Sequence, residues 1–174
     1  MAQLILNNLI RILFLLLLQA LVVSRMDWMH GMILPWIYIF GILMLPFETP
    51  RWVVLVVAGS VGLGMDYFMQ NPGLHTSACL FVGYLQPLIQ KIISPREGYE
   101  ATQRPTVQRM GLPWYLTYAG VLALAHHCWL FYLEVFRFTD FFQTFLRVLL
   151  STIATLLLMT IGQYLIYSAK KSER

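Results

Sequence analysis

Residues 5–24 read ILNNLIRILFLLLLQALVVS, an apolar run whose polar members are two asparagines, one arginine, one glutamine and a final serine. A membrane-spanning helix needs about 20 consecutive, mostly apolar residues. Only Arg11 precedes the central apolar run, and the following Ser24-Arg25-Met26-Asp27 lacks the small-x-small pattern of a signal-peptide cleavage site. We therefore expect a retained first transmembrane helix.

The composition of the whole chain agrees with a membrane environment. Of 174 residues, 59% are hydrophobic and 11% charged, and the mean hydropathy is +0.67, whereas ordinary soluble domains carry about 25% charged residues. A single core of this size cannot bury that much apolar surface. The composition excludes a soluble enzyme, a nucleic-acid binder and a secreted disulfide scaffold.

Five more segments have the length and composition of a spanning helix, at 32–47, 51–69, 73–93, 113–135 and 140–168. Prolines and a tight-turn sequence, Asn71-Pro72-Gly73, separate the early ones. The sequence thus predicts an all-α integral membrane protein, a bundle of six transmembrane helices. It forms a single transmembrane domain over residues 1–174, with a cytoplasmic loop at 94–112 and a short basic tail at 169–174.

The distribution of basic residues predicts the orientation. Cytoplasmic loops of membrane proteins collect Lys and Arg. With the N-terminus inside, nine of the twelve basic residues lie on the cytoplasmic side, and three, namely Arg25, Arg137 and Arg147, lie in the outer half. Both termini are therefore expected in the cytoplasm.

Small residues in the third predicted helix point to close packing. Ala58, Gly62 and Asp66 follow one another at four-residue spacing, and small residues at that spacing let a neighbouring helix approach closely. The turn at Gly73 brings His75 to the start of the next helix. Asp66 and His75 are therefore expected to meet near the outer surface, as a lock between helices or as a proton or ligand site.

Polar groups in the last two predicted helices suggest further contacts between helices. Asp140, Thr144, Arg147, Ser151 and Thr155 share one helix face. Arg147 is expected to pair with Glu134 at similar depth in the outer leaflet.

Two adjacent histidines, His126 and His127, fall near mid-membrane. Consecutive residues of a helix diverge by about 100°, so the two rings are poorly placed to share a metal ion. We expect hydrogen-bonded packing histidines, and no metal site.

Arg11 lies inside the first helix, where it either extends to the inner surface or contacts a helix or a partner. The inner basic residues Arg51, Arg96, Arg104 and Arg109 are candidates for contact with partners or anionic lipid, although topology alone also explains them. No nucleophile motif, paired carboxylates or phosphate-binding loop is present, so neither catalysis nor a cofactor is expected.

The motifs together resemble the rod shape-determining MreD family. The stretch VAGSVGLGMD at 57–66, followed by NPGLH at 71–75, resembles the family signature, with Gly62, Asp66, Gly73 and His75 at matching positions. Further stretches look like the Bacteroidetes branch of the family: Arg11 with QAL at 19–21, LPFETPRW at 45–52, SPREGYE at 94–100, and His126-His127 with LEVF at 133–136.

The resemblance implies a non-enzymatic inner-membrane scaffold of the cell-elongation machinery. Such a protein binds MreC and helps couple MreB filaments to the RodA glycosyltransferase and its partner transpeptidase. The implied fold is similar to the six-helix substrate-binding subunits of energy-coupling-factor transporters. A subunit of such a micronutrient transporter is the alternative function, with Asp66, His75, Glu134 and Arg147 lining an outer pocket.

Overall fold

A computed structural model describes residues 2–26, 29–100, 103–136 and 140–172, with side chains between positions 6 and 165 of these ranges. The long helices are α1 (Ala2–Leu21), α3 (Arg51–Met69), α4 (Leu74–Ile92), α6 (Leu112–Val135) and α7 (Phe141–Ser172). The short helical elements are η1 (Val23–Arg25), η2 (Ile37–Ile39), α2 (Phe40–Leu43) and α5 (Val107–Met110). The described residues contain no strand, so this part of the chain is all-α.

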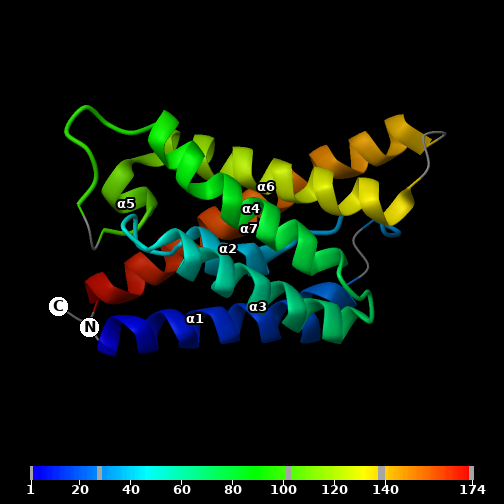
Figure 1. Ribbon diagram of the computed structural model, residues 1–174, viewed down its shortest axis with the longest axis horizontal. Coiled ribbons are helices and arrows are strands. Elements are labelled where there is room, and N and C mark those ends of the chain that lie inside the picture. Colours follow the sequence, from blue (N-terminus) through cyan, green and yellow to red (C-terminus); the bar gives the residue numbers. More distant parts are fainter. Residues whose placement is uncertain (1, 27–28, 101–102, 137–139, 173–174) are drawn as a thin grey trace.

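The five long helices run along the length of one bundle (Figure 1). In this view α1 and α3 lie along one side, α4 and α6 along the other, and α2 lies between them. The first turns of α1 and the last turns of α7 lie at the same end, together with α5. This end also carries the loop between α4 and α6, whose arginines are predicted to be cytoplasmic; we call it the inner end.

Four of the long helices in the described residues, α1, α3, α6 and α7, have stretches long and apolar enough to span a membrane. The chain therefore has the build of a multi-pass membrane protein. The predicted bundle of six spans is thus reduced to four candidates, because α4, predicted as a span at 73–93, is helical but not among them. α4 instead packs against both α3 and α6. This position shields its polar side chains, because His75, Gln86 and Gln90 are all buried.

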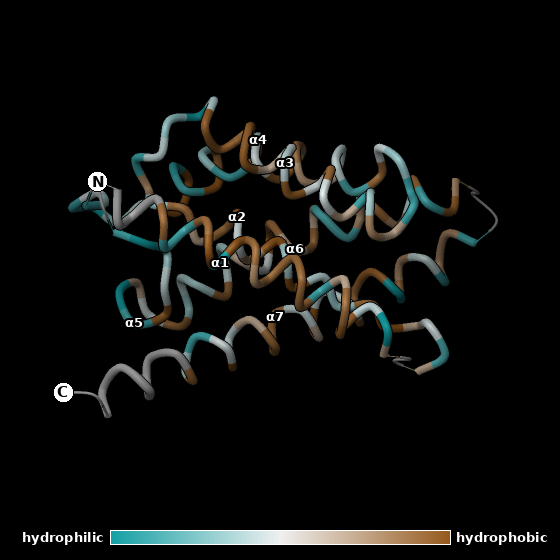
Figure 2. The backbone as a smooth tube through the Cα atoms, turned by 90° about the horizontal axis from the view of Figure 1, so that it is seen from below, coloured by the Kyte–Doolittle hydropathy of each residue, from teal (hydrophilic) through white to brown (hydrophobic). Residues whose placement is uncertain are grey.

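Hydropathy follows the geometry of the bundle. Figure 2 shows the hydrophobic colour concentrated along the long helices and hydrophilic residues gathered in the connections at their ends. Large apolar side chains are exposed on the outer faces of these helices, for example Leu13, Leu63, Ile153 and Leu157, which are 56–62% exposed. Lipid is the environment in which such a surface is stable.

The predicted spanning helix at 32–47 is wrong. Only Ile37–Ile39 and Phe40–Leu43 are helical, as a 3-10 turn followed by a single α turn, and residues 33–36 before them have no regular secondary structure. Pro35 has no backbone N–H and disfavours the helical conformation of the residue before it. The segment nevertheless occupies the middle of the bundle, since every residue from Pro35 to Leu45 is buried.

The other predicted boundaries lie within four residues of the observed ones, those of α3 coincide with the predicted 51–69, and α5 adds a single helical turn inside the predicted loop 94–112. The turn between α3 and α4 follows the sequence signal closely. Gln70 ends α3 with φ 56° and Gly73 precedes α4 with φ +88°. A φ in this range is one that glycine adopts without a Cβ penalty, which explains Gly73 at this turn.

Candidate functional site

The buried segment 34–45 lies at mid-bundle, where its backbone needs partners from the protein. An unpaired backbone group in an apolar interior costs several kcal/mol, so non-helical backbone at membrane depth is tolerated only where protein surrounds it. The segment lacks a full set of helical hydrogen bonds. Side chains of the surrounding helices provide the missing ones.

At the start of the segment, three side chains bind its backbone. Gln19 of α1 does so twice: its Nε2 donates to the Pro35 carbonyl at 3.1 Å, and its Oε1 accepts from the Ile37 amide at 2.8 Å. On α7, Ser151 Oγ accepts from the Leu34 amide at 2.9 Å and Thr155 Oγ1 accepts from the Trp36 amide at 3.1 Å. α1 and α7 are thereby joined through the segment.

At the other end of the segment, side-chain donors bind the carbonyls. Arg11 of α1 donates to the Met44 carbonyl at 3.0 Å and to the Gly41 carbonyl at 3.5 Å. Gln86 of α4 donates to the Ile42 carbonyl at 3.4 Å, and Tyr118 of α6 donates to the Leu43 carbonyl at 2.9 Å. Arg11 was expected either to extend to the inner surface or to contact a helix or a partner. The structure shows a contact inside the bundle.

Between these two ends, the hydroxyl of Tyr38 joins two histidines. Its oxygen lies 3.0 Å from His75 Nδ1 of α4 and 2.8 Å from His126 Nε2 of α6. Tyr38 and both histidines are at most 1% exposed. Because a hydroxyl has a single proton, Tyr38 donates to one ring nitrogen and accepts from the other.

The neighbouring histidine has separate partners. His127 Nδ1 lies 2.7 Å from the Ala123 carbonyl, and its Nε2 lies 3.2 Å from Thr155 Oγ1. The centroids of the His126 and His127 rings are 5.5 Å apart at an interplanar angle of 74°. Within the described residues no group of three His, Cys, Asp or Glu side chains is arranged to hold a metal ion.

Asp66 binds the first turn of α4. Its Oδ1 accepts from the His75 amide at 2.8 Å, while its Oδ2 accepts from the Gly73 amide at 2.9 Å and the Thr76 amide at 3.1 Å. The Thr76 hydroxyl also donates to Oδ2, at 2.5 Å. The carboxylate thus satisfies N–H groups that a helix start leaves free, and its charge is favourable at the positive end of the helix dipole.

The spacing of small residues in α3 corresponds to its contact with α4. A Cβ on Gly62 would lie 2.5 Å from the Thr76 Cα and 2.9 Å from the His75 carbonyl oxygen. One level further in, the Ala58 methyl lies 3.0 Å from the Cβ position of Gly83. Gly62 therefore allows the backbone contact that also brings Asp66 to the start of α4.

The structure brings Glu134 and Arg147 together at the outer ends of α6 and α7. Arg147 Nη1 donates to Glu134 Oε2 at 3.1 Å, and the two side chains are 21% and 38% exposed, respectively. The guanidinium also lies over the Phe131 ring, 4.4 Å from its centroid. Arg147 thus contacts α6 through an ion pair with Glu134 and through a cation–π interaction with Phe131.

The inner basic residues differ in their exposure. Arg51, Arg96 and Arg109 are exposed, whereas Arg104 is half-buried, and burial lowers the pKa of its guanidinium from the ordinary value. The exposed three are open to partners or lipid headgroups.

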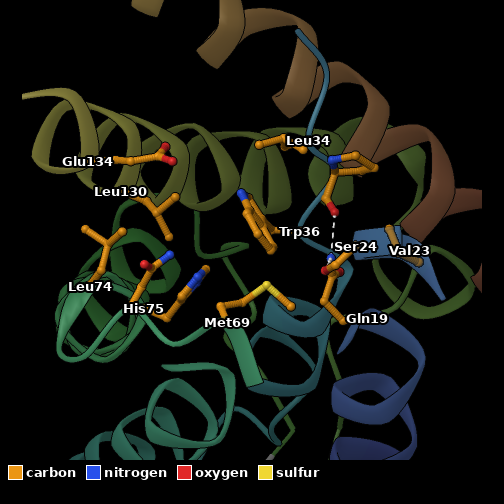
Figure 3. A pocket seen from close by; sticks show the side chains of 12 residues that line it. Gln19, Val23, Ser24, Leu34, Trp36, Met69, Leu74, His75, Leu130 and Glu134 are labelled. Carbon is orange, nitrogen blue, oxygen red and sulfur yellow. Dashed lines mark hydrogen bonds between the residues drawn. The ribbon is translucent and has the colours of Figure 1, made fainter. Parts of the chain in front are cut away.

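A pocket opens toward the other end of the bundle, between the end of α1, the start of segment 34–45 and the turn from α3 to α4 (Figure 3). Its volume is about 210 Å³. His75 and Glu134 line it, but Asp66 and Arg147 are not among the lining residues. The predicted four-residue pocket is therefore only half present.

The sequence-based prediction missed several residues that form the buried contacts of segment 34–45, above all Gln19, Gln86, Tyr38 and Trp36. Gln19 and Gln86 carried a usable signal, since a polar side chain within a membrane span is a functional or structural candidate by default. Tyr38 and Trp36 carried none, because aromatic residues are common in apolar segments.

Comparison with known proteins adds no relative. No family model matches the chain, and neither a curated protein nor a solved structure is significantly similar to it.

Proposed function

We propose that this protein is a non-enzymatic scaffold of the bacterial cell-elongation machinery. It binds MreC in the inner membrane and helps couple MreB filaments to peptidoglycan synthesis by RodA and its transpeptidase. The proposal rests on the sequence resemblance to the MreD family, together with one structural observation on how the buried polar groups are used.

That observation is the internal use of the polar side chains. Arg11, Gln19 and Asp66 each bind backbone groups of another element of the same chain. A protein whose intramembrane polar groups serve its own packing is suited to holding partners in place. This use of the polar groups favours a scaffold over an enzyme.

We propose that MreC binds the exposed side of α1, the side that faces away from the bundle. Only 17% of its apolar stretch Leu6–Arg25 is buried, against 28–44% in the other candidate spans. Its exposed large apolar side chains follow one another at helical spacing: Leu6, Leu9, Ile10, Leu13, Phe14, Leu17 and Leu21. Close van der Waals packing drives association of helices in lipid, so this row suits the single transmembrane helix of a bitopic partner.

The exposed arginines Arg51, Arg96 and Arg109 extend the proposal to the inner surface. They serve there as contacts for cytoplasmic partners or for anionic lipid headgroups, each near-surface charge contributing about 1 kcal/mol of attraction to an anionic membrane.

The test is crosslinking in native membranes, followed by purification of a tagged chain in mild detergent and mass spectrometry. The expected result is recovery of MreC with RodA-type synthesis enzymes. In the variant Leu13→Trp a bulky ring blocks the α1 face, and MreC recovery falls. The matched control Ile153→Trp on α7, a residue similarly exposed, retains MreC.

The alternative function is a substrate-binding subunit of an energy-coupling-factor transporter, which the pocket lined by His75 and Glu134 favours. The same experiment separates the two. Recovery of an ATPase pair with a retained small molecule, and no MreC, replaces the scaffold proposal with this one.

A further inference from the structure

Two arginines from distant parts of the chain come together toward the inner end of the bundle without a carboxylate between them. Arg11 of α1 and Arg104 of the loop between α4 and α6 lie close enough for their positive charges to repel each other. Among the described residues neither forms an ion pair, and no carboxylate acts electrostatically on either one. Both side chains are half-buried. Like charges held together in a partly desolvated place are unfavourable until an anion joins them.

The backbone on both sides of Arg104 is bound to the rest of the bundle. Before it, the Gln103 carbonyl accepts a hydrogen bond from the Phe47 amide at 3.1 Å. After it, the Val107 amide donates to Gln163 Oε1 of α7 at 2.8 Å. The position of Arg104 is therefore defined by the fold, as a preorganised binding residue requires.

The same short stretch of chain positions both arginines. Arg11 donates to the Met44 carbonyl at 3.0 Å. Phe47, three residues further on, stacks on Tyr99 of the loop that carries Arg104, with ring centroids 3.9 Å apart and an interplanar angle of 9°. The proximity of the two guanidinium groups thus follows from how the loop packs on the end of segment 34–45.

Both guanidinium groups keep donors for a ligand. Arg11 uses Nη2 for the Met44 and Gly41 carbonyls. Its Nε is enclosed by the protein, whereas Nη1, which makes no hydrogen bond to a described residue, is not enclosed. The side chain of Arg104 makes no hydrogen bond within the described part of the chain. Guanidinium groups bind phosphate oxygens through short, charge-assisted hydrogen bonds, so a phosphate fits between them.

The surroundings of Arg11 indicate a phosphate attached to acyl chains. Arg11 is the sixth residue of the candidate span Leu6–Arg25, about 8 Å from its first residue at the rise of an α-helix. A long arginine side chain reaches the headgroup layer from such a depth. The adjacent Leu9 and Ile10 are 61% and 57% exposed and provide an apolar surface for acyl chains.

We propose that Arg11 and Arg104 together bind the phosphate headgroup of an anionic lipid in the leaflet at the inner end. The inference does not depend on the scaffold function, because it concerns a ligand of the chain alone. Lipid binding to the purified protein therefore tests it separately from the recovery of MreC.

The test is native mass spectrometry of the full chain in a neutral detergent, which counts the lipids bound per chain during titration. Phosphatidic acid presents an uncompensated phosphate, and phosphatidylcholine presents one that its own ammonium group balances. Glycerol phosphate carries the phosphate without acyl chains and serves as competitor. The expected result is one saturable phosphatidic acid per chain, about tenfold weaker binding of phosphatidylcholine, and no displacement by an excess of glycerol phosphate.

Arg104→Gln is the decisive variant, because this side chain holds no described residue in place and its loss leaves the fold intact. Its affinity for phosphatidic acid is expected to fall about tenfold or more. Arg109→Gln removes an exposed charge from the same inner surface and is the matched control, expected to bind like wild type.

Three outcomes would overturn the proposal. Absence of saturable binding would mean that the two arginines form no site. An equal loss in Arg104→Gln and Arg109→Gln would show a general attraction of the basic surface for anionic lipid. Displacement of phosphatidic acid by glycerol phosphate at equal concentration would show a site for a free phosphate compound and not for a lipid.

Discussion

Oδ1 of Asp66 accepts a hydrogen bond from the backbone amide of His75 at 2.8 Å, so the last turn of α3 holds the first turn of α4. The side chain of His75 points elsewhere, to Tyr38. Asp66 and His75 therefore meet through a backbone amide and not through their side chains. This geometry matches a lock between helices, with Asp66 as its anchor.

Replacing Asp66 with alanine removes the acceptor of three amides and one hydroxyl. The expected loss of unfolding free energy is about 2–4 kcal/mol, since a capping residue alone contributes about 0.5–2 kcal/mol and buried amides are left unsatisfied. Thermal unfolding in detergent, monitored by size-exclusion chromatography, measures it. The control Asp140→Ala removes an exposed acid and is expected to unfold like wild type; equal effects of both variants would contradict the capping role.

Gly62 and Gly59 form a matched pair on α3. A methyl group on Gly62 collides with the backbone of Thr76, whereas one on Gly59 meets only the Leu80 side chain at 3.5 Å. Gly62→Ala is expected to destabilise the protein by more than about 2 kcal/mol, and Gly62→Leu to abolish folded yield in membranes. Gly59→Ala is expected to be neutral or to stabilise by about 0.5–1 kcal/mol through helix propensity. A Gly62→Leu protein that expresses like wild type would show that the helices are not closely packed here.

The Gln19 side chain is expected to be essential for the conformation of segment 34–45. Gln19→Leu keeps a similar size but leaves the Ile37 amide and the Pro35 carbonyl without their partner, at an expected cost of about 2–4 kcal/mol. Hydrogen exchange measured by mass spectrometry is expected to accelerate at residues 36–37.

Gln143→Leu on the exposed surface of α7 is the control for this substitution. It is expected to leave exchange in segment 34–45 unchanged. Unaltered exchange in Gln19→Leu as well would mean that the packing of the segment, and not this side chain, maintains its conformation.

Charge reversal tests the contact between Glu134 and Arg147. Glu134→Arg and Arg147→Glu each place like charges together and are expected to lower the unfolding temperature. The double variant restores an ion pair, but it loses the stacking of a cation on Phe131. Recovery is therefore expected to be partial, with a remaining cost of about 0.5–2 kcal/mol. A double variant that is no more stable than the worse single one would exclude a direct pairing.

The sequence by itself determined the elements whose causes are local. Apolar runs of about 20 residues suffice for a spanning helix, and α1, α3, α6 and α7 lie close to their predicted ranges. The turn before α4 followed from Asn71-Pro72-Gly73, and the Asp66–His75 proximity followed from that turn. The pairing of Glu134 with Arg147 could be predicted because both residues are charged and lie at similar predicted depth in the membrane.

Only the tertiary structure decided the path of segment 34–45. An apolar run of this length has the same composition whether it forms a continuous helix or an irregular core segment. The groups that bind the irregular part lie 16 to 119 residues away in the chain, on Gln19, Ser151 and Thr155. Hydrogen bonds over such separations exist only once the helices have packed, which is why the irregular path of this segment could not be predicted from the sequence.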